Sequence, residues 1–413
     1  MFFIQGGGFT SNSNANYNGS DLARVGNMIV VSINYRVGPY GYLLGKEVIE
    51  GDGSTNNGAR DQIKALEWTK AHIEKFGGDP EHIVLNGDSA GAMSIVILMA
   101  SPAIKGKDLF RGVIAESTAV IPLKTLEQSQ VQYDCLAKAT ACSNTTNSLS
   151  LDCLRKVNAS SLQTTTCKFG PTFDTDIIPS RLLLNRAYAH TLSKIPSIFG
   201  TTQNEGTKTA PQSINSTSDF RSFFLSAAPF LSDSALNDLY AMYAASEQPV
   251  FPNSGRLWRA ASNAVGDISF NCPTRVYAGN SSWLYKFAPQ DPALEVSGVG
   301  AYHTIELHAI WGPNNTDGNP PKSYLPGGVN AHVVPLMQRY VASFVRWLDP
   351  NVVRWKGAPA WERGGDGRVL RVAGANATAM EGNDESLQKR CAKLWPIVEA
   401  LEVSPPEGTK VDL

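Results

Sequence analysis

Residues 83–94, IVLNGDSAGAMS, place a serine between an apolar run and a second apolar stretch. The run at residues 83–85 is short and rich in β-branched side chains, which predicts a buried strand, and the spacing after Ser89 predicts a helix. Gly87 and Gly91 flank the serine where a Cβ would obstruct a sharp turn. This pattern is typical of a nucleophile elbow, although an ordinary glycine-rich loop carries the same five letters. Other groups must therefore decide between the two.

Strand-like and helix-like segments alternate along the chain. An amphipathic helix is predicted over residues 57–76, and polar tracts at 143–150 and 312–328 are predicted to be surface loops. Without an internal repeat, residues 1–413 are predicted to form a single domain with a mainly parallel sheet flanked by helices. The predicted strands are residues 2–5, 28–35, 83–85, 110–116, 194–200 and 283–287.

Composition excludes several classes of partner. The net charge is −1, and lysine and arginine are scattered, so the chain lacks the basic surface that nucleic acid or an anionic membrane requires. The longest apolar runs, such as residues 28–33 and 95–100, are too short to span a bilayer. With 42% hydrophobic residues, the chain has enough apolar side chains for a large core. We therefore expect a soluble protein without nucleic-acid or membrane partners.

Cysteines and sequons point to the secretory route. The six cysteines include no C-x-x-C pair, which disfavours a zinc or redox site and favours disulfides. The first nine residues, MFFIQGGGF, have neither a basic segment nor a cleavage site, so they are not a signal peptide. Either the start is truncated or the protein is not secreted. Seven N-x-S/T sequons begin at Asn18, Asn144, Asn158, Asn215, Asn280, Asn314 and Asn376.

An elbow serine needs backbone donors for the oxyanion that forms on attack. Gly6, Gly7 and Gly8 directly follow the first predicted strand, where a backbone without side chains can turn its amides toward a substrate oxygen. A plain glycine turn is the alternative.

A histidine must act as the base. In hydrolases of this kind the chain order is serine, acid, histidine, which excludes His72 and His82 and favours His303, in a loop after a late strand. We expect a structural role for the remaining three, which lie in helical contexts: His190, His308 and His332.

For the acid, Glu205 follows the predicted strand at residues 194–200, at the end of a sheet strand where catalytic loops occur. Gly206 would let that loop turn sharply. Three aspartates, Asp174, Asp176 and Asp267, also lie between the serine and the histidine. Spacing does not choose among these four carboxylates.

Six segments in order resemble the type-B carboxylesterase/lipase family, the cholinesterase-like α/β-hydrolases. They are QGGGF, SINYRVGPYGYL, NNGARDQIKALEWTKAHIEKFGGDP, GDSAG, TQNEGT and AYHTIELHAIWG. The match is dense over residues 1–120, thins through the middle and returns around Glu205 and His303. The resemblance implies an α/β-hydrolase fold and hydrolysis of small carboxylic esters by a serine nucleophile, without a metal or organic cofactor.

The resemblance also implies roles for individual residues. Ser89 corresponds to the nucleophile, Glu205 to the acid and His303 to the base, while the amides of Gly7, Gly8 and Ala90 correspond to the oxyanion donors. Because the base must be neutral, activity should fall as the pH drops through about 6 to 7. Cys142 with Cys153, and Cys272 with Cys391, resemble family disulfides, whereas Cys135 and Cys167 could pair together or stay free.

Departures from the family pattern leave alternatives. The family's early strands and disulfide-closed flap are missing, so we expect an N-terminally truncated, secreted protein whose signal peptide lies upstream, with an unpaired sheet edge. Asp88 stands where many relatives have glutamate, a variant of fungal members. A lipase acting on long-chain acylglycerols and a non-catalytic adhesion protein are the alternative functions. The sequence leaves the oligomeric state open.

Overall fold

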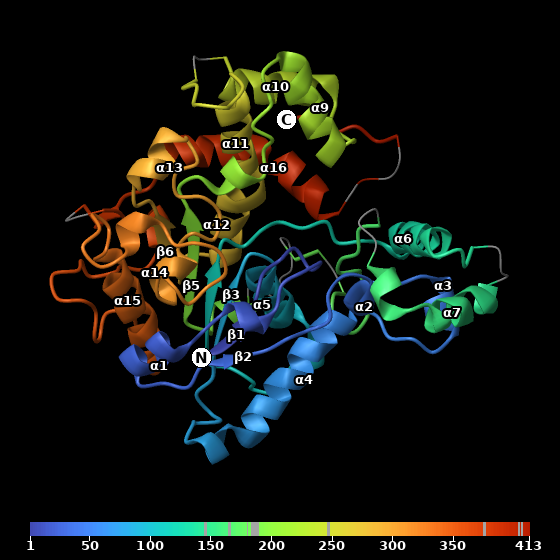
Figure 1. Cartoon of the computed structure of the whole chain (residues 1–413), viewed down its shortest axis with the longest axis horizontal. Coiled ribbons are helices and arrows are strands. Elements are labelled where there is room, and N and C mark those ends of the chain that lie inside the picture. The colour runs from blue at the N-terminus through green and yellow to red at the C-terminus, as the bar shows by residue number, and fades with distance from the viewer. Residues whose placement is uncertain are drawn as a thin grey trace.

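In the computed structural model, which describes residues 1–143, 147–163, 167–179, 181–182, 190–245, 248–374, 377–403, 405 and 408–413, one sheet lies at the centre (Figure 1). Its described strands follow the order β2-β1-β3-β4-β5-β6-β7-β8, and neighbours run parallel except β8, which is antiparallel to β7. The predicted α/β class is confirmed. The strands are β1 (Phe2–Ile4), β2 (Val31–Ser32), β3 (Val84–Asp88), β4 (Gly112–Glu116), β5 (Ser197–Thr202), β6 (Trp283–Phe287), β7 (Val369–Val372) and β8 (Ala379–Glu381).

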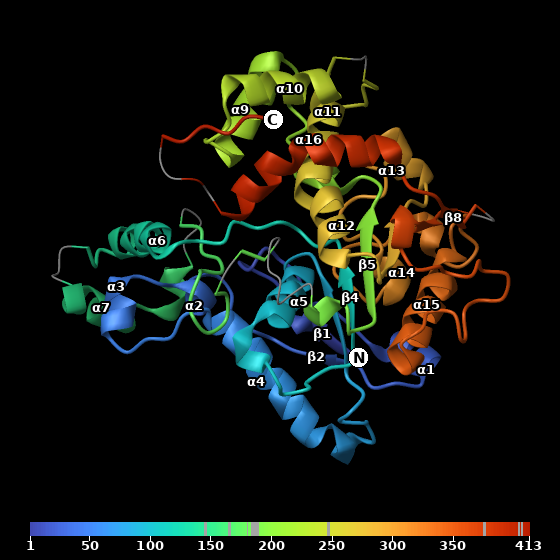
Figure 2. The ribbon, with the colours of Figure 1, turned by 180° about the vertical axis from the view of Figure 1, so that it is seen from behind.

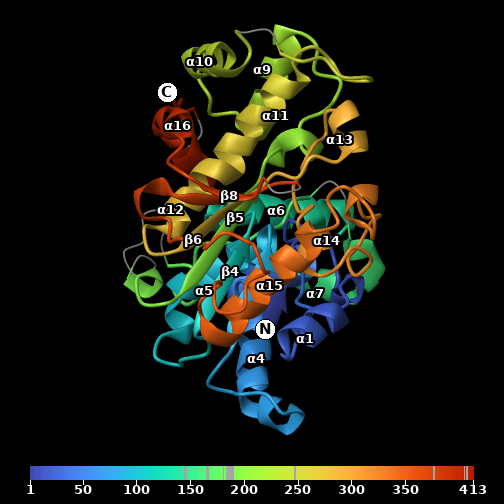
Figure 3. The ribbon, with the colours of Figure 1, turned by 90° about the vertical axis from the view of Figure 1, so that its left-hand side faces the viewer.

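Helices cover both faces of this sheet. Figure 3 shows α5 and α12 on one side of the strands and α1 and α14 on the other. The helices are α1 (Ser20–Gly26), α2 (Gly38–Tyr42), α3 (Lys46–Glu50), α4 (Asn57–His72), α5 (Ala90–Ala100), α6 (Leu126–Ala139), α7 (Asn147–Lys156), α9 (Thr217–Ala227), α10 (Asp233–Tyr243), α11 (Trp258–Gly266), α12 (Cys272–Ala278), α13 (Pro292–Val296), α14 (Leu307–Ile310), α15 (Val333–Trp347) and α16 (Glu385–Glu402).

Each face of the sheet carries its own apolar core. Along β6, Trp283, Tyr285 and Phe287 pack on the face covered by α14 and α15, while Leu284 faces the larger core under α5, α12 and α16. This alternation follows from the period of two along a strand. Because both faces are covered, the central strands are nearly continuous apolar runs, which is why the sequence reveals them.

One strand prediction was too long, and two strands were not predicted. Of residues 28–35, only Val31–Ser32 pair, because β2 lies at the sheet edge and its one described partner strand, β1, is three residues long. The short strands β7 and β8 were not predicted at all, since runs of four and three residues carry little periodic signal.

Two further segments differ in part from their predictions. The helix predicted over residues 57–76 ends as α4 at His72 and continues as a 3₁₀ turn, Ile73–Phe76. The polar tract at residues 143–150 was predicted to be a loop, but its last four residues begin α7. Polarity alone does not distinguish a loop from the first turn of a helix. The tract at residues 312–328 consists mostly of turns, as predicted.

Three disulfides join neighbouring elements. Cys142–Cys153 and Cys272–Cys391 form as the resemblance implied, and the remaining cysteines pair as Cys135–Cys167. The Cys272–Cys391 disulfide links α12 to α16, which lie against each other (Figure 2). None of the helices in the described ranges has the length and apolar character to cross a bilayer.

Candidate active site

The predicted elbow has the geometry that its glycines require. Ser89 lies between β3 and α5, with φ 52° and ψ −117°, a conformation that residues other than glycine rarely adopt. A Cβ on Gly91 would lie 1.9 Å from the carbonyl oxygen of Ile4, and one on Gly87 would lie 2.7 Å from the backbone of Gly91. The two glycines therefore let the turn pack against β1, and the serine is held on a strained corner at the carboxyl end of the sheet.

Ser89, His303 and Glu205 come together in a row. The Nε2 atom of His303 lies 2.9 Å from the Oγ of Ser89, and its Nδ1 lies 2.6 Å from the Oε2 of Glu205. The Glu205 side chain is fully buried, whereas His303 is 19% exposed. An imidazole protonated on Nδ1 donates to Glu205 and leaves Nε2 free to accept the serine proton.

Asn204 joins the loop of Glu205 to the loop of His303. Its backbone N–H donates to the carbonyl of Ala301 over 2.9 Å, and its side-chain oxygen accepts from the N–H of Ala301 over 3.0 Å. Gly300, with φ 60°, must be a glycine here, because a Cβ would lie 2.1 Å from that side-chain oxygen. These contacts hold the loop of Glu205 close to the loop of His303, although the two residues are 98 positions apart in the chain.

Buried polar side chains hold Glu205 in place. Its Oε1 accepts from the N–H of Thr202 over 2.6 Å and from the hydroxyl of Ser117 over 2.8 Å. Ser117 also lies 3.2 Å from the Oε1 of Glu306, a buried residue that accepts from the Tyr285 hydroxyl. Sequence analysis missed Ser117 and Glu306. For Ser117, the one available signal was the polar pair Glu116-Ser117 at the end of an apolar strand. For Glu306, the spacing His303-x-x-Glu306 matches no known local motif.

Charge and burial act in opposite directions on the histidine. Burial lowers the pKa of His303, but the neighbouring carboxylate of Glu205, together with the charges of Glu306 and Asp88, raises it, and the net pKa lies above 6.5. Burial, followed by repulsion from Glu205, raises the pKa of Glu306 to about 8. Near neutral pH, Glu306 is therefore mostly protonated.

The variant Glu306→Gln is expected to keep hydrolytic activity within about threefold, because it replaces a protonated carboxyl with a neutral amide of the same shape. A folded pKa of about 8 against 4.5 in the unfolded chain means that this group stabilises the fold at low pH, and the contribution is lost as the pH rises through 8. The variant should therefore gain stability relative to wild type between pH 5 and pH 8. Melting temperatures of both proteins at those pH values measure this, and parallel changes would contradict it.

The glycines after β1 lie beside Ser89. Gly7 and Gly8 have φ values of 108° and 62°, and they line a pocket of about 420 Å³ together with Ser89 and His303. In the described part of the chain, no protein acceptor is recorded for the amides of Gly7, Gly8 or Ala90. These amides are thus available to an oxygen bound next to the serine.

Asp88 ties this glycine loop to the elbow. Its Oδ1 accepts from the N–H of Gly6 over 2.9 Å, and a Cβ on Gly6 would lie 2.6 Å from the other carboxyl oxygen. Burial raises the pKa of Asp88 to about 6, although the Gly6 hydrogen bond opposes this. The residue that differs from many relatives therefore has a local structural role.

The other histidines take part in local packing. His308 lines the same pocket, which sequence analysis missed, but its Nδ1 lies 3.0 Å from the carbonyl of Pro313 and 2.9 Å from the hydroxyl of Thr316. Burial lowers its pKa. The remaining four lie away from Ser89: His72 stacks on Trp68, His82 approaches the Val345 carbonyl, His190 is exposed, and His332 precedes α15.

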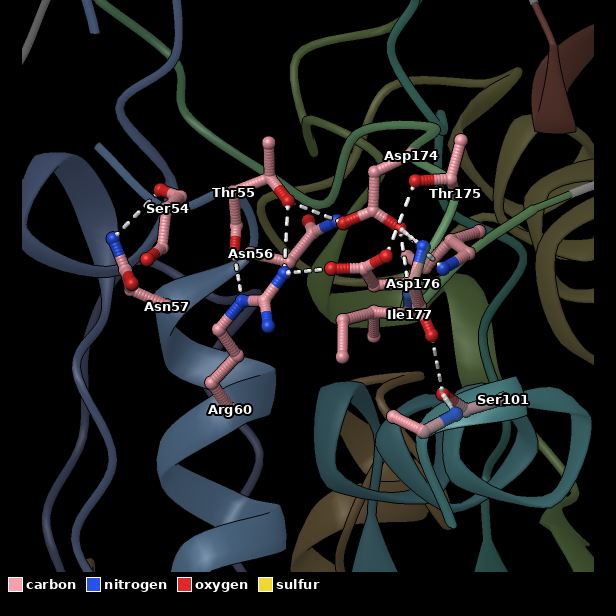
Figure 4. A network of polar contacts seen from close by, with 12 residues as sticks. Ser54, Thr55, Asn56, Asn57, Arg60, Ser101, Asp174, Thr175, Asp176 and Ile177 are labelled. Carbon is pink, nitrogen blue, oxygen red and sulfur yellow. Dashed lines mark hydrogen bonds and ion pairs between the residues drawn. The ribbon is translucent and has the colours of Figure 1, made fainter. Parts of the chain in front are cut away.

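The alternative acids have other partners. Figure 4 shows Asp174 and Asp176 joining their segment to the start of α4, where Asp174 accepts from Asn56 over 2.8 Å and Asp176 pairs with Arg60 over 3.1 Å. Asp267 is bound by Tyr243, Asn271 and Arg390. Within the described ranges, no cluster of three or more His, Cys, Asp or Glu side chains is placed to hold a metal ion.

Comparisons with known proteins show the family of this chain. Residues 1–390 match the carboxylesterase family. Secreted lipase 1 of Botryotinia fuckeliana is 30% identical over 85% of this chain and 65% of its own length, and para-nitrobenzyl esterase of Bacillus subtilis is 32% identical over 77% and 64%. The crystal structure of Aspergillus niger EstA superposes with a TM-score of 0.88 at 33% identity, covering 97% of this chain and 81% of EstA. The chain spans about two thirds of the length of these curated relatives. It belongs to the carboxylesterase family.

Proposed function

We propose that this chain is a serine hydrolase that cleaves carboxylic esters through an acyl-enzyme intermediate. The observation that carries the proposal is the row of Ser89, His303 and Glu205, with spacings of 2.9 and 2.6 Å, beside the amides of Gly7 and Gly8. A nucleophile, a base and an orienting acid within hydrogen-bond reach are what covalent acyl transfer requires. The proposal treats residues 1–413 as one domain, since a single sheet carries all of these loops.

In the first half-reaction, the Ser89 oxygen attacks the ester carbonyl while its proton passes to Nε2 of neutral His303. The carbonyl electron pair moves onto oxygen, which faces the amides of Gly7, Gly8 and Ala90. Glu205 holds the ring and stabilises the imidazolium. The tetrahedral intermediate then collapses, His303 returns the proton to the leaving oxygen, and the alcohol departs from an ester on Ser89.

In the second half-reaction, His303 takes a proton from water as the water oxygen attacks the acyl carbon. Collapse expels the Ser89 oxygen, which regains a proton from His303, and the acid leaves. The residues present suffice for both steps, since each proton that His303 accepts is given back within the same half-reaction.

A direct test combines labelling with turnover. The chain should react with a fluorophosphonate probe at Ser89 and hydrolyse p-nitrophenyl acetate. Peptide mapping of the labelled protein locates the adduct. Absence of both labelling and turnover in a folded chain would contradict the proposal and favour a non-catalytic binding role.

The pH dependence of kcat/KM should report His303. The base must be neutral, and the net effect of its neighbours raises the pKa of His303 above 6.5. Activity should therefore be lost as the pH falls, with the midpoint on the high side of 6.5. Initial rates at saturating and subsaturating ester between pH 5 and 9 measure this. A profile that stays flat down to pH 5.5 would exclude His303 as the base.

Lipase activity is the second candidate, because secreted lipase 1 of Botryotinia fuckeliana matches 85% of this chain. The pocket beside Ser89 favours short esters instead: it holds about 420 Å³, and polar side chains such as Asn12, Thr304 and Asp317 contribute to its lining. Long acyl chains need an apolar surface. Rates on p-nitrophenyl esters of increasing chain length distinguish the two, since an esterase declines beyond short acyl groups and a lipase does not.

Secretion is proposed on two observations. A matched relative is named as secreted, and the chain has three disulfides, which persist in oxidising compartments. The described sequon asparagines are all exposed, as N-glycosylation requires: Asn18, Asn158, Asn215, Asn280 and Asn314. Asn144 and Asn376 lie outside the described residues. A mobility shift after glycosidase treatment of protein from the native host tests this.

A further inference from the structure

An aromatic ring packs directly on the imidazole of His303. The centroid of Phe270 lies 4.5 Å from that of His303, with the ring planes tilted by 45°. Phe270 is buried, and it is the aromatic neighbour recorded for His303 within the described ranges. Offset or tilted ring pairs at this separation are attractive and restrict how each ring can turn.

Phe270 comes from an unusual piece of backbone. Residues Asp267–Asn271 form a single π-helical turn, η6, between α11 and α12. Such turns are rare and concentrate at functional sites, where the extra residue redirects side chains. Here Phe270 of this turn contacts the histidine, while Asp267, three residues earlier, lines a cleft together with Tyr243 and Arg390.

The turn is anchored on several sides. Both carboxyl oxygens of Asp267 are engaged: Oδ2 accepts from Tyr243 over 2.8 Å and from Arg390 over 2.7 Å, and Oδ1 accepts from Asn271 over 2.9 Å. The carbonyl of Ser269 accepts from the N–H of Val120 over 2.8 Å.

A covalent link follows directly, because Cys272 is bonded to Cys391 of α16. The ring of Phe270 is therefore presented by a turn that has little freedom to move.

The reaction makes this support useful at one particular stage. Before acylation, hydrogen bonds at both ring nitrogens orient His303. Once Ser89 is acylated, its oxygen carries no proton, and the bond at Nε2 is replaced by a transient contact with water. The imidazole is then held by Glu205 at one nitrogen and by packing. A ring free to rotate about that single bond would spend less time aligned for proton transfer.

We infer that Phe270 is a positioning residue for His303, which keeps Nε2 directed at the reacting oxygen when Ser89 no longer holds it. The inference rests on the proposed function and extends it to a residue that contacts the imidazole of the base. The hydrogen bonds of Asp267 and the Cys272–Cys391 disulfide hold the π-helical turn, and through Phe270 this turn would hold the imidazole of His303 in position.

The test compares three variants of the full chain. Phe270→Leu removes the ring plane and keeps an apolar side chain, and Phe270→Tyr restores the ring. Phe224→Leu is the matched control, because Phe224 is similarly buried and stacks on Phe220 in α9, away from the site. Phe270→Leu should lower kcat by about 10- to 100-fold with KM changed less than about twofold, since misplacement of a catalytic group costs on this scale. Phe270→Tyr should recover most of the rate.

The pH profile supplies a readout that a loss of stability would not move. Burial lowers the pKa of His303, and the acidic side chains that face it, those of Glu205, Glu306 and Asp88, are kept in all variants. Opening space beside the ring admits water and weakens the effect of burial, so the acid limb of kcat/KM should move to higher pH in Phe270→Leu alone.

A proton NMR titration of His303, assigned with a His303→Gln variant, measures the same pKa without turnover. If wild type neither turns over nor labels, the proposed function fails, and this titration still tests the inference. If wild type is active but Phe270→Leu has the same kcat and the same His303 pKa as wild type, the inference is overturned while the proposed function stands. An equal loss of rate in Phe224→Leu would also overturn it, as would failure of Phe270→Tyr to recover the rate at wild-type melting temperature.

Discussion

Replacement of Ser89 by alanine should reduce ester hydrolysis by about 10⁴- to 10⁶-fold and abolish fluorophosphonate labelling. The reason is chemical: without the Oγ there is no atom to form the acyl-enzyme, and the remaining rate comes from the oxyanion donors acting on water. The fold should survive, because the φ of 52° at this position strains alanine and serine alike. Steady-state rates on p-nitrophenyl acetate and a thermal melt measure both effects.

Ser94 offers a matched control for this experiment. It lies in α5, five residues after Ser89, and its buried hydroxyl donates to the Ala90 carbonyl and accepts from Gln62. Ser94→Ala should lower stability by about 1 to 2 kcal/mol, since the Gln62 amide loses its acceptor, while turnover changes little. Equal losses of activity in both variants would mean that α5 is disturbed and that Ser89 has no special part. Retained turnover in Ser89→Ala would exclude it as the nucleophile.

Replacement of Glu205 by glutamine should lower kcat by about 10⁴-fold, the cost of an acid-to-amide change in a triad. The amide oxygen should take the position of Oε1, where Thr202 and Ser117 donate. Its NH₂ group would then face Nδ1 of His303. Nδ1 must accept that hydrogen bond, so the ring proton moves to Nε2, where it blocks uptake of the serine proton.

Glu306→Gln is the natural control for Glu205→Gln. Both changes convert a buried carboxyl near His303 into an amide, but Glu306 is already protonated at neutral pH, since its pKa is raised to about 8. Rates of fluorophosphonate labelling and of turnover, measured on both variants at pH 7.5, should fall steeply for Glu205→Gln alone. If Glu306→Gln shows the larger loss, the roles of the two glutamates are reversed.

The comparison of the two glutamates illustrates where sequence reasoning stops. Spacing favoured Glu205 but did not exclude Asp174, Asp176 or Asp267 as the acid. In the structure Asp174 and Asp176 join α4 to a distant segment, and Asp267 supports the turn before α12. A carboxylate used as a structural anchor and one used as a catalytic orienter have the same local sequence signature, because partners from other parts of the chain define the difference.

The histidines show the same division. Chain order favoured His303, and the structure places its Nε2 next to Ser89. His308 nevertheless lines the same pocket, five residues away on α14, although its context predicted packing alone. Its ring is bound to Pro313 and Thr316. Which of two nearby histidines reaches the serine depends on how the loop before α14 is held, and Asn204, from a separate loop, contacts Gly300 and Ala301 of that loop.

What the amino-acid order determined by itself was local: the strand, the elbow glycines around Ser89, the glycine loop after β1 and the alternation of a parallel α/β sheet. These features depend on neighbours within a few positions, through steric limits at the backbone and the periods of strand and helix. The tertiary structure alone decided the meeting of residues 89, 205 and 303, the protonated Glu306 behind them and the contact of Phe270 with His303. Such contacts join side chains from separate elements of the fold, or depend on the burial that raises a pKa, and both exist only once the sheet and its two helical layers have packed together.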